Sequence, residues 1–161
     1  MIKEKLLQME KTGTYVFHGS PESNIEVLEP RQGTHIPDMT KPSEMINDGK
    51  PAISATPYVE LAIFRAVING VNVPFDHNSG FDVNECVASF SVSSEKVLEA
   101  VKGKKGYVYV FNKNEFEPYS RDGEIQEGLM EWRSYSTVKP VEIIEVTSED
   151  LPSRQRINIT G

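Results

Sequence analysis

The sequence predicts a single α+β domain over residues 1–161, with a strongly bent, mostly antiparallel sheet, one buried helix and short flanking helices. Helical and β-rich segments do not alternate regularly along the chain, which argues against a doubly wound parallel sheet. A chain of 161 residues is of ordinary single-domain size, and it is long enough to bury about two-thirds of the surface that it exposes when unfolded. Hydrophobic residues make up 38% and charged residues 25%, a globular composition and not a disordered one.

The first half of the chain is expected to contain two helices and two strands. In order, these are a short helix over residues 2–10, a strand over 14–18 broken at 19–21, a long loop over 29–50, a strand over 51–56 and a helix over 58–69. The second helix is apolar on nearly all sides, so we expect it to be largely buried. Thr56 and Pro57 suit its capping position and its first helical position.

The second half is expected to consist mostly of strands. The elements are a loop over 74–82, a strand over 83–92, a short helix over 95–102 with a serine cap, and strands over 107–111, 127–135, 141–146 and, as a candidate, 157–159. Tyr107 and Tyr109 alternate with valines, so they should share one face of their strand.

Charge and cysteine content limit the possible partners and the compartment. The net charge is −7, which argues against non-specific nucleic-acid binding, and we interpret the one basic cluster, residues 102–106, as a solvated turn. Cys86 is the only cysteine, so no internal disulfide is possible, and its apolar neighbours favour an inert core thiol over a nucleophile. No signal peptide and no apolar run of about 20 residues is present, so we expect a cytoplasmic protein without a membrane partner.

Common catalytic motifs are missing, and one histidine stands out. The sequence has no CxxC, HExxH, Walker, GxGxxG or GxSxG motif, and its histidines are far apart, so no metal site is expected. His18 ends the first predicted strand, where its ring N–H would reach a ligand hydroxyl. Gly19 follows, and without a side chain it would let a flat ligand approach the backbone. The alternative is a partly buried histidine that is hydrogen-bonded to a loop.

Three short patches of the sequence resemble one known family. Residues 15–20 (YVFHGS), followed by 25–30 (IEVLEP), resemble the opening of ADP-ribosyltransferase-fold proteins, in which the first strand ends in His-Gly-Ser. Residues 51–56 (PAISAT), which lead into the helix, are similar to the second key strand of that family. Residues 131–134 (EWRS) are similar to the late strand that begins with the family's glutamate. The nearest branch is the His-Tyr-Glu branch, which includes diphtheria toxin, poly(ADP-ribose) polymerases and tRNA 2′-phosphotransferases.

The resemblance, which spans residues 14–147, implies that NAD is a substrate. It implies that His18 binds the hydroxyls of the adenosine ribose and that the backbone of Gly19 holds the nicotinamide amide. It also implies that Glu131 contacts the nicotinamide ribose and stabilises positive charge as the C–N bond breaks. Glu124 and Glu127 are the alternatives to Glu131 if the register differs.

The tyrosine that stacks on nicotinamide in this branch has no direct counterpart. Its position falls on Ile53 or Ser54, and Tyr58 lies just beyond. The further candidate binding residues are therefore Ser20, Ser54 and Tyr58.

Three functions are consistent with the sequence. The first is an NAD-dependent ADP-ribosyltransferase or NAD glycohydrolase that acts on an unidentified macromolecular acceptor. The second is a catalytically inactive module of the same fold that binds a nucleotide or a protein. The third is an RNA 2′-phosphotransferase, for which the candidate phosphate-binding residues are Arg31, Arg65 and Arg133.

Overall fold

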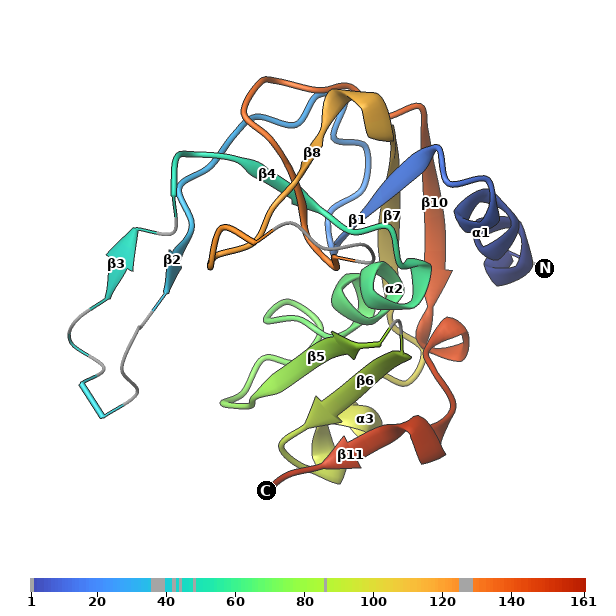
Figure 1. Ribbon diagram of the computed structural model, residues 1–161. Helices are drawn as coiled ribbons and strands as arrows, with labels where there is room; N and C mark the ends of the chain where they lie inside the picture. The colour runs from blue at the N-terminus through green and yellow to red at the C-terminus, as the bar shows by residue number, and fades with distance from the viewer. Residues whose placement is uncertain are drawn as a thin grey trace.

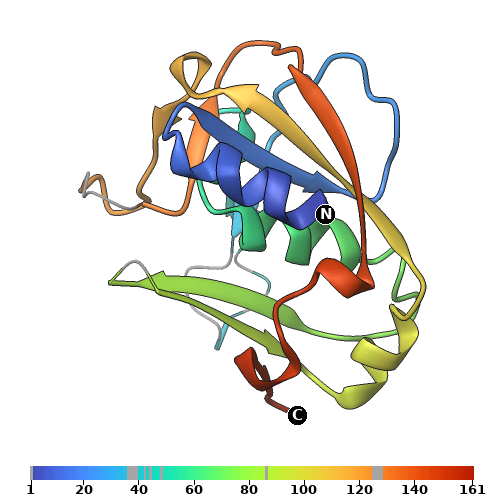
Figure 2. The same cartoon turned by 90° about the vertical axis from the view of Figure 1, so that its right-hand side faces the viewer.

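Helix α2 (Val59–Val67) lies at the centre of the computed structural model, between two layers of strands (Figure 1). One layer is an antiparallel sheet in the order β1 (Tyr15–Ser20), β7 (Lys105–Asn112) and β10 (Glu142–Thr147). The other is a sheet of β5 (Ser79–Asn84), β6 (Val87–Val92) and β11 (Ile157–Ile159). The view from the side shows α2 enclosed between them (Figure 2). This position explains the all-round apolar composition of the helix, in which every residue except Glu60 and Arg65 is buried.

The structure describes residues 2–35, 40–41, 43, 45–47, 49–85, 87–124 and 129–161. Within these residues the fold is α+β, as predicted, and the only parallel pairing between named strands joins β11 to β6. The remaining helices are α1 (Ile2–Lys11) and α3 (Glu95–Ala100), and the smaller sheets are β2 (Thr34–His35) with β3 (Ile46–Asn47) and β4 (Ile53–Ala55) with β9 (Trp132–Ser134) and β8 (Glu117–Pro118). No helix among these residues is both long and apolar enough to cross a bilayer.

Strands β1 and β7 separate the two parts of the hydrophobic core. Phe17 of β1 and Val108 of β7 face α2 and belong to the larger cluster. Their neighbours Val16 and Tyr109 face the other side and form a second cluster, against which Tyr107 also packs. Alternate residues of a strand point to opposite faces, so this division follows from the β-period. It confirms that Tyr107 and Tyr109 share one face.

Several predicted boundaries were wrong, for identifiable reasons. Strand β1 does not end at His18 but continues through Ser20, because Gly19 and Ser20 still lie opposite Val108 and Tyr107 in the ladder with β7. The predicted single strand over 83–92 is part of the β5–β6 hairpin, which turns at Glu85 with a φ of 52°. The predicted loop over 29–50 contains the short β2–β3 pair.

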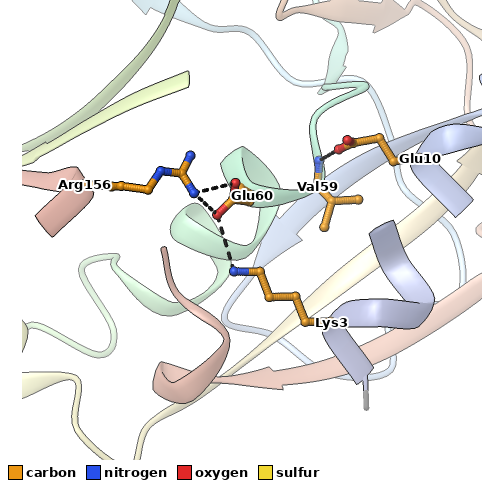
Figure 3. Close-up of polar contacts among 5 residues, drawn as sticks. All are labelled: Lys3, Glu10, Val59, Glu60 and Arg156. Atoms are coloured by element: carbon orange, nitrogen blue, oxygen red, sulfur yellow. Dashed lines mark hydrogen bonds and ion pairs between the residues drawn. The ribbon is translucent and has the colours of Figure 1, made fainter. Parts of the chain in front are cut away.

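The predicted caps of the helices differ in their contacts. Ser94 occupies the N-cap position of α3, as predicted, but its side chain makes no hydrogen bond to the helix. Thr56 does not cap α2, because its backbone is bridged to Phe17 and the helix begins later, after Tyr58. The carboxylate of Glu10 takes the capping role instead, since Glu10 Oε2 accepts a hydrogen bond of 2.6 Å from the N–H of Val59 (Figure 3). Of the predicted strand over 127–135, the part Trp132–Ser134 is formed. Two further candidates, Glu127 and Cys86, lie outside the described residues.

Candidate functional site

Strands β1 and β4 separate after a single bridge, and His18 spans the gap between them. Phe17 and Thr56 exchange backbone hydrogen bonds of 2.7 and 2.8 Å. In a continuing antiparallel ladder, the next hydrogen-bonded pair would be Gly19 with Ser54. Instead, the carbonyl oxygen of Ser54 lies 2.7 Å from Nδ1 of His18. The ring of His18 therefore takes the place of a backbone group and holds the two strands apart.

Two cavities adjoin at this gap, and both are lined by His18 and Ser54. The first, which we call the α2 cavity, has a volume of about 230 Å³. Its other lining residues include Gly19, Leu61, Ala62, Arg65, Phe81 and Glu131. The second, the basic cavity, has a volume of about 260 Å³ and its other lining residues include Glu29, Arg31, Gln32, Lys50, Ile53 and Arg133. A ligand with two linked halves would thus find two adjacent compartments.

His18 is held as a neutral ring with one defined acceptor. The Ser54 carbonyl only accepts hydrogen bonds, so Nδ1 of His18 carries the proton and donates it. Burial lowers the pKa of His18 below the ordinary 6.5, and the nearby charge of Arg31 lowers it further, while the Ser54 hydrogen bond opposes both effects. The neutral ring leaves Nε2 as an acceptor. The ring N–H that we expected to reach a ligand hydroxyl is therefore already used, and the ring would accept a hydrogen bond from such a hydroxyl instead.

Gly19 is required by the packing of α2 as well as by its place at the cavity. A Cβ at this position would lie 2.0 Å from the carbonyl oxygen of Ala62 and 2.7 Å from the nitrogen of Ala66. Because Phe17 points its N–H and C=O toward β4, Gly19, two residues later, points its own N–H and C=O to the same side, away from β7. This places one donor and one acceptor side by side at the α2 cavity.

Glu131 is bound to Ser54 and Arg133 through one of its two oxygens. Oε2 accepts a hydrogen bond of 2.8 Å from the Ser54 hydroxyl and one of 2.5 Å from Nε of Arg133. Strand β9 pairs with β4 so that Arg133 lies opposite Ser54, which brings all three side chains together. Neither contact uses Oε1. Predicted site residues from three distant segments, His18, Ser54 and Glu131, thus line one cavity.

Arg133 is the most buried charged group of the site. It is 5% exposed, and its guanidinium lies over the ring of Tyr119 at 3.5 Å from the centroid. It was a candidate for phosphate binding, whereas the structure has its Nε on Glu131. Glu131 and Arg133 are two residues apart, and side chains at this spacing in an extended segment share a face. This spacing is the sequence feature that could have predicted their contact.

Other predicted residues lie outside the two cavities. Ser20 is buried, and its hydroxyl accepts a hydrogen bond of 3.1 Å from the N–H of Glu22, a turn contact. Tyr58 packs against the larger core cluster and is not among the described residues that line either cavity. Glu124 is exposed. Ile53 is buried and borders the basic cavity.

Two walls of the α2 cavity were missed. Phe81 comes from β5, in a segment predicted as a loop, and Met130 lies just before Glu131. Phe81 has no local sequence signal, because β5 reaches the cavity only through its packing on α2.

The donor set of the site favours an organic ligand. Among the described residues, no group of three or more His, Cys, Asp or Glu side chains gathers as a metal ion would require. The site offers a neutral imidazole acceptor, a backbone donor and acceptor, a carboxylate and several cations.

No protein-family model, no curated protein and no solved structure matches this chain, so a functional assignment rests on the geometry of the site itself.

Proposed function

We propose that this protein binds NAD across the two cavities and breaks its nicotinamide–ribose bond, as an ADP-ribosyltransferase or an NAD glycohydrolase. The observation that carries the proposal is that Glu131 and His18 line the same cavity and are linked through Ser54. The acceptor would be a macromolecule or water. The cytoplasmic location expected from the sequence, where NAD is available, is part of the proposal.

The groups at the α2 cavity match the nicotinamide half of NAD. A primary carboxamide has an acceptor and a donor side by side, which complement the N–H and C=O of Gly19. The neutral His18 ring would accept a hydrogen bond from a ribose hydroxyl through Nε2. The basic cavity, with Arg31 and Lys50, would take the diphosphate.

The reaction needs little from the protein besides charge and position. The bond between ribose C1′ and the nicotinamide nitrogen breaks, and its electron pair leaves with nicotinamide, which becomes neutral. The ribose carries the positive charge, and the carboxylate of Glu131 stabilises it electrostatically. A hydroxyl of the acceptor, or water, then bonds to C1′ and releases its proton. Ser54 and Arg133 would hold Glu131 in place by Oε2, so that Oε1 faces the reacting ribose.

The test is nicotinamide release from NAD by the wild type and by Glu131→Gln. We expect the variant to be slower by about 100-fold or more, the usual cost of removing one group that stabilises a transition state. Glu60→Gln is the matched control, because Glu60 is also a half-buried, ion-paired carboxylate but lies on the outer end of α2; its rate should match the wild type. Equal rates for wild type and Glu131→Gln, over a panel of protein and nucleic-acid acceptors, would reject the enzymatic proposal. NAD binding without turnover would instead support the inactive nucleotide-binding module.

The charge of the basic cavity favours a second candidate, transfer of a 2′-phosphate from RNA to NAD. Arg31, Lys50 and Arg133 line this cavity with Glu29 as the acidic member, in a protein whose net charge is −7. A 2′-phosphorylated oligonucleotide incubated with NAD would lose its phosphate if this candidate holds. Arg31→Gln should then slow that loss, because Arg31 lines the cavity that would hold the transferred phosphate.

A further inference from the structure

Arg65 is one of the two charged residues of α2, and the other is Glu60. Nη1 of Arg65 donates a long hydrogen bond of 3.4 Å to the Ser79 hydroxyl, and its guanidinium carbon lies 4.8 Å from the centroid of the Phe81 ring. Within the described part of the chain, no carboxylate pairs with it. The side chain is half-buried, and desolvation lowers the pKa of Arg65. A cation withdrawn from water in this way is costly unless an anion compensates it.

The surroundings of Arg65 hold the guanidinium toward the α2 cavity. Leu61 and Ala62 lie one helical turn earlier on α2, and all three residues line this cavity. Phe81 covers one face of the guanidinium plane, which leaves its N–H groups along the edge. A planar fork of donors with one face covered is suited to bidentate contact with a carboxylate or a phosphate.

Besides the linked group of His18, Ser54 and Glu131, the α2 cavity has two polar regions with different requirements. The N–H and C=O of Gly19 require a neutral group that both accepts and donates. Arg65 requires an anion. The nicotinamide ring of NAD supplies the first, and neither this ring nor its ribose carries an anionic group for the second.

We infer that Arg65 binds an oxyanion, a carboxylate or a phosphate, on the second substrate. This inference rests on the proposed function, and it adds that the acceptor carries an oxyanion near the nucleophile that attacks the ribose. The diphosphate of NAD is the other possible source of the same chemistry, and the experiment separates the two sources.

The first measurement is a titration of the protein with inorganic phosphate and, separately, with acetate at low ionic strength. Binding is monitored by the ¹H–¹⁵N chemical shifts. Both anions should shift the resonances of residues around the α2 cavity. The affinity should fall by about 10-fold in Arg65→Gln and be partly retained in Arg65→Lys, because a lysine keeps the charge but loses the fork. The control is Arg154→Gln, whose guanidinium is paired with Glu95 far from the cavity; it should bind as the wild type does. Equal affinity in wild type and Arg65→Gln would overturn the inference.

The second measurement repeats the phosphate titration with a non-hydrolysable NAD analogue bound. Unchanged phosphate affinity supports an acceptor-borne anion, whereas strict competition means that the diphosphate of NAD occupies Arg65 and overturns the acceptor assignment. The outcomes are separable from those of the proposed function. Arg65-dependent anion binding in a protein that neither binds nor cleaves NAD would refute only the proposed function, and NAD turnover without anion binding would refute only this inference.

Discussion

The two ends of helix α2 each carry one charged residue, Glu60 and Arg65, and the two residues differ in the partners that surround them. At the N-terminal end, Glu60 uses both oxygens: Arg156 donates to each at 2.8 Å, and Lys3 donates to one at 3.3 Å (Figure 3). Its partners come from the two ends of the chain, α1 and the C-terminal segment. At the other end, Arg65 meets a hydroxyl and an aromatic ring. A charge paired by distant segments holds the fold together, whereas a charge at a cavity for which the described residues supply no counter-ion is suited to a ligand.

The N-terminal end is also where the fold supplies a cap to the helix. Glu10 of α1 accepts a hydrogen bond from Val59, and burial raises the pKa of Glu10 while this bond opposes the rise. Three residue pairs, Glu10 with Val59 and Glu60 with Lys3 and with Arg156, therefore join α1 and the C-terminal segment to α2 on this side. At the other end the helix is held by amides instead, since Asn69 donates to the carbonyls of Arg65 and Ala66 and Asn72 donates to that of Val67.

The largest expected effect concerns the contact between α2 and β1 beside the cavity. In Gly19→Ala the new methyl would lie 2.0 Å from the carbonyl of Ala62, and since backbone atoms on both sides have to move, we expect a loss of about 3 kcal/mol in unfolding free energy. Urea denaturation measures this. Gly70→Ala is the control, because no atom lies within 4 Å of its added Cβ, and it should stay within about 0.5 kcal/mol of the wild type. A Gly19→Ala protein of native stability would contradict the close packing of these two elements.

The next prediction compares how much Glu60 and Arg65 each contribute to the unfolding free energy. Glu60→Gln should lower the unfolding free energy by about 1 kcal/mol, because it breaks a partly exposed network of two cations. Arg65→Gln should cost nothing within about 0.5 kcal/mol, or even stabilise the protein, since it removes a poorly compensated charge. Thermal and urea denaturation of both variants measure the difference. If Arg65→Gln were as destabilising as Glu60→Gln, Arg65 would be a structural residue and the contrast between the two ends would disappear.

The sequence predicted the α+β fold and the buried helix, because these follow from composition and periodicity over many residues. It did not predict how α2 begins: Thr56 and Pro57 form a good local capping signal, but the tertiary bridge of Thr56 to Phe17 and the arrival of Glu10 override it. The β5–β6 hairpin was hidden for a similar reason. Its turn uses Glu85 at positive φ, where local rules lead one to expect glycine or asparagine.

The site shows the same division between local and tertiary information. His18, Ser54 and Glu131 were identified from short motifs, and each lies at the cavity. Tyr58 was chosen for its proximity in sequence, and its place at the start of α2 turns it to the core. The surroundings of Arg65, which meets Ser79 and Phe81 and no described carboxylate, had no sequence signal, because they depend on the packing of β5 against α2.

The smallest expected effect is a pH dependence that arises from His18, and it contrasts the neutral ring at the cavity with the paired carboxylate of Glu60 on α2. The folded-state pKa of His18 is lowered from 6.5 by burial, so the neutral ring contributes stability that is present above pH 6.5 and is lost as the pH falls toward the lowered value. A single group of this kind changes the unfolding free energy by at most about 1.4 kcal/mol per pH unit. Binding of a ligand hydroxyl to Nε2 should weaken over the same interval, since the protonated ring has no acceptor. We expect His18→Gln, measured by NAD titration and urea denaturation between pH 5 and pH 8, to flatten both dependences. A wild-type affinity for NAD that rises as the pH falls would show instead that the ligand needs the charged ring, and the hydrogen bond to Ser54 would then have to be given up on binding.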